Sequence, residues 1–85
     1  MTPVYVLLGG TGGIGAVLAR RLRADGATVV VAARDTDRLA ALAGETGAEA
    51  FVVDATDADA VAARVADARA RHGRVDGVAN LVGSI

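Results

Sequence analysis

The sequence predicts an α/β protein with a doubly wound parallel sheet, whose two faces are both covered by helices. Four short runs rich in apolar and β-branched residues alternate with three segments whose apolar residues recur at helical spacing. The connections between them are only a few residues long, and glycines mark several boundaries. Such alternation implies right-handed crossovers and a parallel sheet. We therefore expect the strand order 3-2-1-4, with a switch point between the first and fourth strands.

The first strand and the first helix are separated by glycines. Pro3–Leu8 is a short apolar run that stops at glycine, as a buried parallel strand does. A helical period begins at Gly13, and Gly26 follows where a C-terminal cap belongs. One face of this helix is expected to carry four apolar residues: Ile14, Val17, Leu18 and Leu22.

The second strand and helix follow the same plan. Ala27–Ala33 is β-branched and apolar, which is typical of a central strand. Either Asp35 or Thr36 can cap the helix that follows, because both side chains accept hydrogen bonds from backbone N–H groups. We expect this helix to end near Gly44–Gly47.

The last third of the chain repeats the pattern. Glu49–Val53 is predicted to form the third strand. Thr56 with Asp59 resembles a capping box that opens a helix, which we expect to end near Gly73. Asp76–Val82 is the predicted fourth strand.

The composition limits the classes of protein that the chain can represent. It has 85 residues, 53% of them hydrophobic, with a net charge of −1 and no cysteine, so disulfides and thiolate metal sites are excluded. No apolar run approaches the roughly 20 residues of a membrane span. The near-neutral charge gives no electrostatic reason for nucleic-acid binding. We therefore expect a cytoplasmic protein without a membrane or nucleic-acid partner.

A cluster of glycines, GGTGGIG at residues 9–15, connects the first strand to the first helix. A phosphate-binding loop of the Walker type is excluded, because Ala16 and Val17 follow the last glycine instead of Lys-Ser/Thr. Two other spacings fit: G-x-G-x-x-G at Gly10, Gly12 and Gly15, and G-x-x-x-G-x-G at Gly9, Gly13 and Gly15. Such glycines allow a tight turn and a close approach of backbone to pyrophosphate at a helix N-terminus. A purely structural turn is the alternative, but the strand before and the helix after favour a dinucleotide-binding Rossmann fold.

From Val4 to Ile85 the chain resembles the N-terminal third of a short-chain dehydrogenase/reductase. Gly9, Gly13, Ile14 and Gly15 match that family's T-G-x-x-x-G-I-G loop, with Leu8 in place of the threonine. The resemblance implies that Asp54, in VVDATD with Ala55 beside it, contacts the adenine ring. Asn80–Gly83 (NLVG) corresponds to the family's N-N-A-G, which stabilises the sheet and lies along the cofactor. Two of those four letters differ, at Leu81 and Val82.

The residue that follows the second strand indicates which dinucleotide binds. Ala33 is neutral and Arg34 comes next, whose guanidinium can grip a 2′-phosphate through two hydrogen bonds. We therefore expect NADP(H), with NAD as the alternative, because Asp35 lies about twenty residues beyond Gly15, near the spacing of a ribose-binding acid. Arg34 could instead pair with Asp35 or Asp37 in solvent. The expected cofactor-binding residues are Gly9, Thr11, Gly12, Gly13, Ile14, Gly15, Arg34, Asp54, Ala55, Asn80 and Gly83.

Several of the polar residues also have structural interpretations. Asp54 could cap the third helix, although Thr56 already offers that role, and Asn80 could bond between neighbouring strands. His72 is expected to cap helical carbonyls beside Gly73. No metal site is expected, because the acids of the third helix start, Asp54, Asp57 and Asp59, suit a helix N-terminus better. The arginines at 64, 69, 71 and 74 are expected to form a solvated face.

The family's catalytic groups have no match in these residues. The resemblance implies hydride transfer between nicotinamide and a carbonyl or alcohol, with a tyrosine and a lysine four residues on. Tyr5 lies inside the first strand, there is no lysine, and Ser84 comes too early to match the catalytic serine. We therefore expect no catalytic residue here and interpret residues 1–85 as the N-terminal part of one Rossmann domain, truncated after the fourth strand. A small-molecule substrate and a homo-oligomer are expected only of the full-length protein. The alternative is a non-catalytic nucleotide-binding module.

Overall fold

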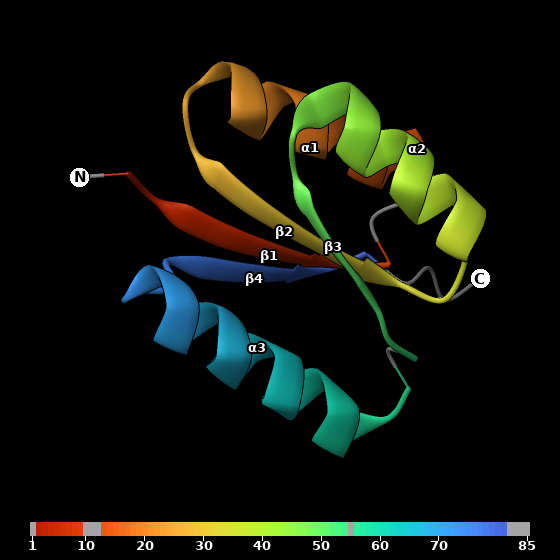
Figure 1. The fold of residues 1–85 in the computed structure, drawn as a ribbon, viewed down its shortest axis with the longest axis vertical. Coiled ribbons are helices and arrows are strands. Elements are labelled where there is room, and N and C mark those ends of the chain that lie inside the picture. The colour runs from red at the N-terminus through yellow and green to blue at the C-terminus, as the bar shows by residue number, and fades with distance from the viewer. Residues whose placement is uncertain (1, 10–12, 55, 82–85) are drawn as a thin grey trace.

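The computed structural model describes residues 2–9, 13–54 and 56–81, and within them four parallel strands form one sheet (Figure 1). The strands are β1 (Val4–Leu8), β2 (Thr28–Ala33), β3 (Glu49–Val52) and β4 (Gly77–Asn80). Their order is β3-β2-β1-β4, so the predicted order is confirmed. In the register of the sheet, Leu7 lies opposite Val31 on one side and Ala79 on the other.

Three helices cover the two faces of the sheet within the described ranges. Helices α1 (Gly13–Ala24) and α2 (Thr36–Thr46) lie on one face, and α3 (Ala58–His72) lies on the other (Figure 1). This division follows from right-handed crossovers. The chain winds outward from β1 to β3 over one face and then returns under the sheet to β4, on the far side of β1.

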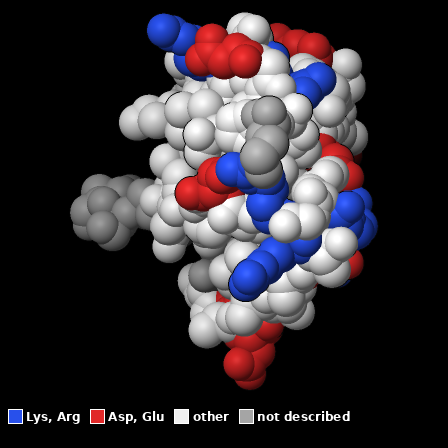
Figure 2. Space-filling model, turned by 90° about the vertical axis from the view of Figure 1, so that its left-hand side faces the viewer, with Lys and Arg blue, Asp and Glu red and all other residues white. Residues whose placement is uncertain are grey.

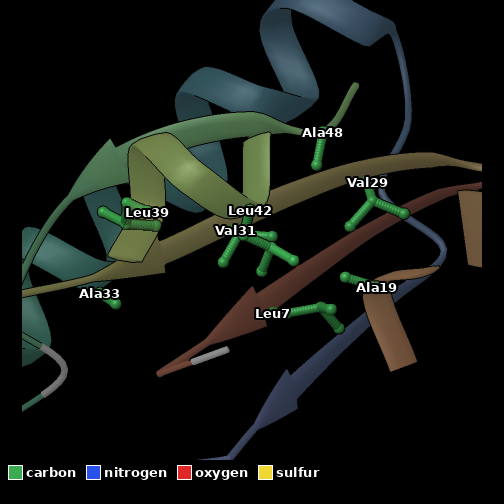
Figure 3. Close-up of a cluster of buried hydrophobic side chains, with 8 residues drawn as sticks. All are labelled: Leu7, Ala19, Val29, Val31, Ala33, Leu39, Leu42 and Ala48. Carbon is green, nitrogen blue, oxygen red and sulfur yellow. The ribbon is translucent and has the colours of Figure 1, made fainter. Parts of the chain in front are cut away.

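Each face of the sheet buries its own apolar cluster, because successive side chains of a strand point to opposite faces. The cluster under α1 and α2, shown in Figure 3, comprises Leu7, Ala19, Val29, Val31, Ala33, Leu39, Leu42 and Ala48. The cluster over α3 comprises Val6, Leu8, Val30, Ala32, Val53 and Ala68. The two inner strands contribute to both clusters, which explains why their sequences are continuous apolar runs.

Helix α1 buries only part of the face that the sequence predicts. Gly15 and Ala19 are its buried residues, whereas Ile14 and Val17 are 79% and 62% exposed. Of the four residues predicted to share a face, only Leu18 and Leu22 pack against the core. The small side chains let the helix approach the sheet closely, so the line of Gly15, Ala19 and Leu22 faces inward and the prediction for Ile14 and Val17 is wrong.

The helix caps correct one further prediction. Asp35 caps α2, since its Oδ1 accepts from the backbone N–H of Arg38 at 3.0 Å. The cap of α3 is Asp57, whose Oδ1 accepts from the N–H of Ala60 at 3.1 Å, and not Thr56. Thr56 is unavailable because its own N–H and hydroxyl both donate to Asp54. Both helices end as expected, at Gly47 and Gly73 with left-handed φ of 77° and 80°.

Charged side chains hold the amino-terminal end of the sheet together. The carboxylate of Asp76 accepts from the N–H of Val4 at 2.7 Å and from the guanidinium of Arg74 at 2.9 Å. The N–H of Asp76 also donates to the carbonyl of Val4 at 2.8 Å, and β4 begins at the next residue, Gly77, one later than predicted. Figure 2 views this end of the molecule, where acidic and basic side chains adjoin near the middle of the face.

Strand β3 is attached to the end of α3 by a second set of charges. The carboxylate of Glu49 accepts from Arg71 at 2.6 Å and bonds to Nε2 of His72. The prediction that His72 caps helical carbonyls is therefore wrong, and Arg71 is paired with Glu49 and Asp67 instead of being simply solvated. The guanidinium groups of Arg64 and Arg71 also lie over the ring of Phe51, at 5.1 and 4.8 Å from its centre.

Candidate functional site

The carboxyl ends of the strands bring the predicted site residues to one edge of the sheet. Gly9 follows β1, Arg34 follows β2, Asp54 lies two residues beyond β3, and Asn80 is the last residue of β4. In a doubly wound sheet, ligands bind outside this edge, at the point where the strand order reverses. Here that point lies between β1, from which the chain continues through α1 to β2, and β4, which the chain reaches through α3 on the other face.

The turn that leaves β1 requires a glycine. Gly9 has a φ of 72°, in the left-handed region that side chains disfavour, and its N–H donates to the carbonyl of Ala32 at 2.6 Å. Gly13 is different, because a Cβ added there would meet no described atom within 4 Å. Packing among the described residues therefore does not demand a glycine at position 13.

The N-terminus of α1 points to this edge with no acidic residue in its first turn. In this it differs from α2 and α3, which carry Asp37 and Asp59 in their first turns and the acidic caps Asp35 and Asp57. Unpaired N–H groups and the helix dipole make a helix N-terminus attractive to anions. The acids that would neutralise this potential are present at the other two helices and missing from the first turn of α1.

Arg34 extends from the end of β2 into solvent, with 75% of its side chain exposed. Its Nη1 lies 3.6 Å from Oδ2 of Asp54. Arg34 does not pair with Asp35, which was the alternative. Asp35 caps α2 and lies 3.5 Å from the guanidinium of Arg38. Arg34 and Asp54, which are predicted to contact different parts of a cofactor, are thus neighbours.

Asp54 is held in place by Thr56. Its Oδ1 accepts from the backbone N–H of Thr56 at 2.9 Å and from the hydroxyl at 2.7 Å. These two hydrogen bonds, together with the charge of Arg34, hold the pKa of Asp54 below its ordinary value. The carboxylate is therefore ionised at neutral pH, with Oδ2 directed to Arg34.

A shallow hollow lies beside this pair, between the end of β3 and the first turns of α3. Arg34, Asp54 and Arg64 bring charge to it, and its apolar lining consists of Val52, Val53, Ala60 and Ala63. Arg64 was not among the residues predicted from the sequence to form the site. Its position two turns into α3 gave no signal by itself, since only the packing of α3 against β3 brings it to this edge.

The structure describes only some of the other residues that the sequence predicts for the site. Asn80 ends β4 opposite Leu8, and the next N–H, of Leu81, donates to the carbonyl of Leu8 at 2.8 Å. Thr11, Gly12, Ala55 and Gly83 lie outside the described residues, as do Gly10 and Ser84. Tyr5 lies half-buried in β1 with its ring against Gly77, where an added Cβ would come within 3.1 Å of Cδ1.

The described residues contain neither a cluster of metal-ligating side chains nor a helix able to span a membrane. No group of three or more His, Asp or Glu side chains gathers there in a way that could hold a metal ion. Asp54 faces Arg34 and Thr56, while Asp57 is used as a helix cap. No helix in the described ranges has both the length and the apolar character that crossing a membrane requires.

Comparison with known proteins extends these observations. A family model described as short chain dehydrogenase matches residues 3–85. A protein of Streptomyces violaceoruber assigned as ketoacyl reductase 1 of the granaticin polyketide synthase is 43% identical over 86 residues. The match covers 95% of this chain and 32% of that protein. The chain thus spans about a third of the length of this curated relative.

Solved structures agree with the family model. A variant of actinorhodin polyketide ketoreductase with NADPH has a TM-score of 0.88 and 32% identity, covering 98% of this chain and 34% of that one. A metagenomic short-chain oxidoreductase in complex with NADP has a TM-score of 0.83 and 40% identity, covering 89% and 37% of the two chains. With a family model that spans almost all of its residues and relatives that share its fold, the chain belongs to the short-chain dehydrogenase/reductase family.

Proposed function

We propose that this chain is the cofactor-binding N-terminal part of an oxidoreductase that uses NADP(H). The observation that carries the proposal is Arg34, an exposed guanidinium at the end of β2 where an NAD-dependent enzyme has an acid. Two of the related structures, with NADPH and with NADP, support the same choice. The acid that could have served NAD, Asp35, is engaged as the cap of α2.

The described residues fit a dinucleotide. The pyrophosphate lies against the N-terminus of α1, where Gly13, Ile14 and Gly15 open the helix without an acidic neighbour. Gly9 makes the turn that clears this space, and Arg34 binds the 2′-phosphate.

The remaining residues complete the proposed site. Asp54 contacts the adenine, with Ala55 beside it. Asn80 and Gly83 contact the cofactor along its length, and Thr11 and Gly12, which follow Gly9 in the sequence, are assigned to the same site. These assignments rest on the resemblance of the sequence to the family's motifs.

The bound nicotinamide would supply or accept the hydride, and the substrate would be a carbonyl or alcohol compound. The related ketoacyl reductase and polyketide ketoreductase support a carbonyl substrate. The groups that move the proton are assigned to residues outside this chain, because it holds no lysine and its one tyrosine lies within β1. Sequencing the gene beyond Ile85 tests this part, since a Tyr-x-x-x-Lys pair in the same reading frame is required.

Isothermal titration of the chain with NADPH and NADH tests the binding part. We expect NADPH to bind more tightly than NADH. Tighter binding of NADH would overturn the choice of cofactor. Failure of both to bind would overturn the proposal that this edge of the sheet is a dinucleotide site.

A further inference from the structure

The structure holds Arg34 beside a carboxylate at the place where a phosphate is proposed to bind. Nη1 of Arg34 and Oδ2 of Asp54 are 3.6 Å apart, and both side chains are substantially exposed, at 75% and 44%. The pair joins the ends of β2 and β3, which are adjacent strands with parallel register. The two residues are 20 apart in sequence, and the fold alone brings them together.

Thr56 determines which oxygen of Asp54 faces the arginine. Both of its hydrogen bonds go to Oδ1, which leaves Oδ2 for Arg34. Asp54 cannot turn away from Arg34 without disrupting these bonds. The carboxylate is therefore a fixed negative charge next to Arg34.

A fixed negative charge affects the two dinucleotides differently. The 2′-phosphate of NADP(H) carries up to two negative charges and must compete with Asp54 for the guanidinium of Arg34. A dinucleotide without that phosphate meets no such competition. Any contact between Asp54 and the adenine is common to both cofactors and cancels in the ratio of their affinities.

Resting on the function proposed above, we propose that Asp54 is a selectivity-determining residue that acts through Arg34. It reduces the preference for the phosphorylated dinucleotide below the value that Arg34 alone would give. It is a positioning residue in this role, because it acts on the 2′-phosphate by way of the guanidinium.

The test is a double-mutant cycle on the ratio of dissociation constants, Kd for NADH divided by Kd for NADPH, measured by isothermal titration. In Asp54→Asn we expect the ratio to rise about two- to fivefold, the range for an exposed ion pair. In an Arg34→Gln background the same change should leave the ratio unaltered. The increase should also shrink at 1 M salt, because exposed charges are screened there.

A matched control separates this effect from general electrostatics. Asp59→Asn removes the same charge from the first turn of α3 and leaves the Arg34–Asp54 pair intact. We expect it to leave the ratio unchanged. Circular dichroism of each variant establishes that it is folded before its affinities are compared.

The outcomes distinguish this inference from the proposal on which it rests. If both cofactors bind the parent chain but Asp54→Asn leaves the ratio unchanged or lowers it, the role of Asp54 is wrong and the dinucleotide site stands. An equal rise in the Arg34→Gln background, or in Asp59→Asn, would likewise overturn it. If neither cofactor binds the parent chain, the proposed function fails, and this inference fails with it.

Discussion

The two ends of the sheet both carry charged side chains, but they differ in how closely those charges are paired. At the amino-terminal end, Asp76 and Glu49 are only 25% and 33% exposed, and each accepts hydrogen bonds from two groups. At the carboxyl-terminal end, Arg34 is 75% exposed and lies 3.6 Å from Asp54. The first arrangement connects strands and a helix of the protein, whereas the second leaves a guanidinium accessible to another molecule.

This difference indicates a division of labour along one sheet. Partly buried, multiply bonded carboxylates stabilise the fold, because removing them leaves partly buried donors without partners. Exposed and loosely paired charges contribute little to stability and are available for recognition. Variants at the two ends should therefore separate stability from cofactor affinity.

The largest expected effect is at the carboxyl-terminal end. Arg34→Gln should weaken NADPH binding about tenfold to hundredfold, as expected for the loss of a charge-assisted contact to phosphate, and leave the melting temperature unchanged. Titration calorimetry and thermal melts measure the two quantities. The control is Arg21→Gln on α1, which removes another exposed arginine, 4.0 Å from Asp25, and should change neither quantity. Equal loss of NADH and NADPH affinity in Arg34→Gln would contradict a phosphate contact.

The N-terminal cap of α3, Asp57, also lies at the carboxyl-terminal end of the sheet and should affect stability but not cofactor selectivity. Asp57→Ala should cost about 1 kcal/mol of unfolding free energy, because the N–H of Ala60 loses its acceptor. Its ratio of NADH to NADPH affinity should stay unchanged, since Asp57 serves α3 and not Arg34. Urea denaturation measures the stability. A changed ratio would mean that net negative charge at this edge, and not its position, determines selectivity.

At the amino-terminal end, Glu49→Gln should reduce the unfolding free energy by about 1 kcal/mol or less, because the carboxylate is a third exposed and solvent screens its pairs. NADPH affinity should not change. Urea denaturation and calorimetry on the same sample compare the two. The matched variant is Glu45→Gln, which removes an exposed partner of Arg20 on the α1–α2 face and should have a smaller effect.

The smallest expected effect is on how the unfolding free energy decreases at acidic pH. Partial burial raises the pKa of Glu49, but hydrogen bonds from His72 and Arg71 outweigh it, so the pKa lies below the ordinary 4.5. Hydrogen bonds from Arg74 and from the N–H of Val4 lower the pKa of Asp76 below 3.8.

Because both values are lowered on folding, the two groups stabilise the protein above these ordinary values, and this contribution is lost as the pH falls through the folded values. Urea denaturation between pH 5 and pH 2 should show this loss. The double variant Glu49→Gln, Asp76→Asn should show a shallower decline than the parent. An unchanged slope would mean that these carboxylates do not hold the amino-terminal end together.

Much of the fold could be predicted from the sequence, because its determinants are local. Continuous apolar runs identified the central strands, and glycines at 47 and 73 marked helix ends through their left-handed conformation. The crossover rule then fixed the order of the strands. The face of α1 was predicted correctly for Leu18 and Leu22 and wrongly for Ile14 and Val17, because large apolar residues suggest burial, whereas the small residues Gly15 and Ala19 are the buried ones.

The candidate site was predictable only as far as its residues follow strand ends. Gly9, Arg34, Asp54 and Asn80 reach one edge because parallel strands end there. The pairing of Arg34 with Asp54 depends on the register between β2 and β3, and the approach of Arg64 to the hollow depends on how α3 packs. The sequence offered Asp54 and Thr56 as N-terminal caps of α3, but Asp57 is the cap. Thr56 instead donates its hydroxyl hydrogen bond to Asp54.

The most direct test of the division between the two ends is a titration of the ¹⁵N-labelled chain with NADPH, followed by ¹H–¹⁵N correlation spectra. The account predicts that the amide resonances of Gly9, Gly13, Arg34 and Asp54 shift with the cofactor, while those around Glu49 and Asp76 stay in place. Shifts concentrated at Glu49 and Asp76, or none at the carboxyl-terminal edge, would contradict it.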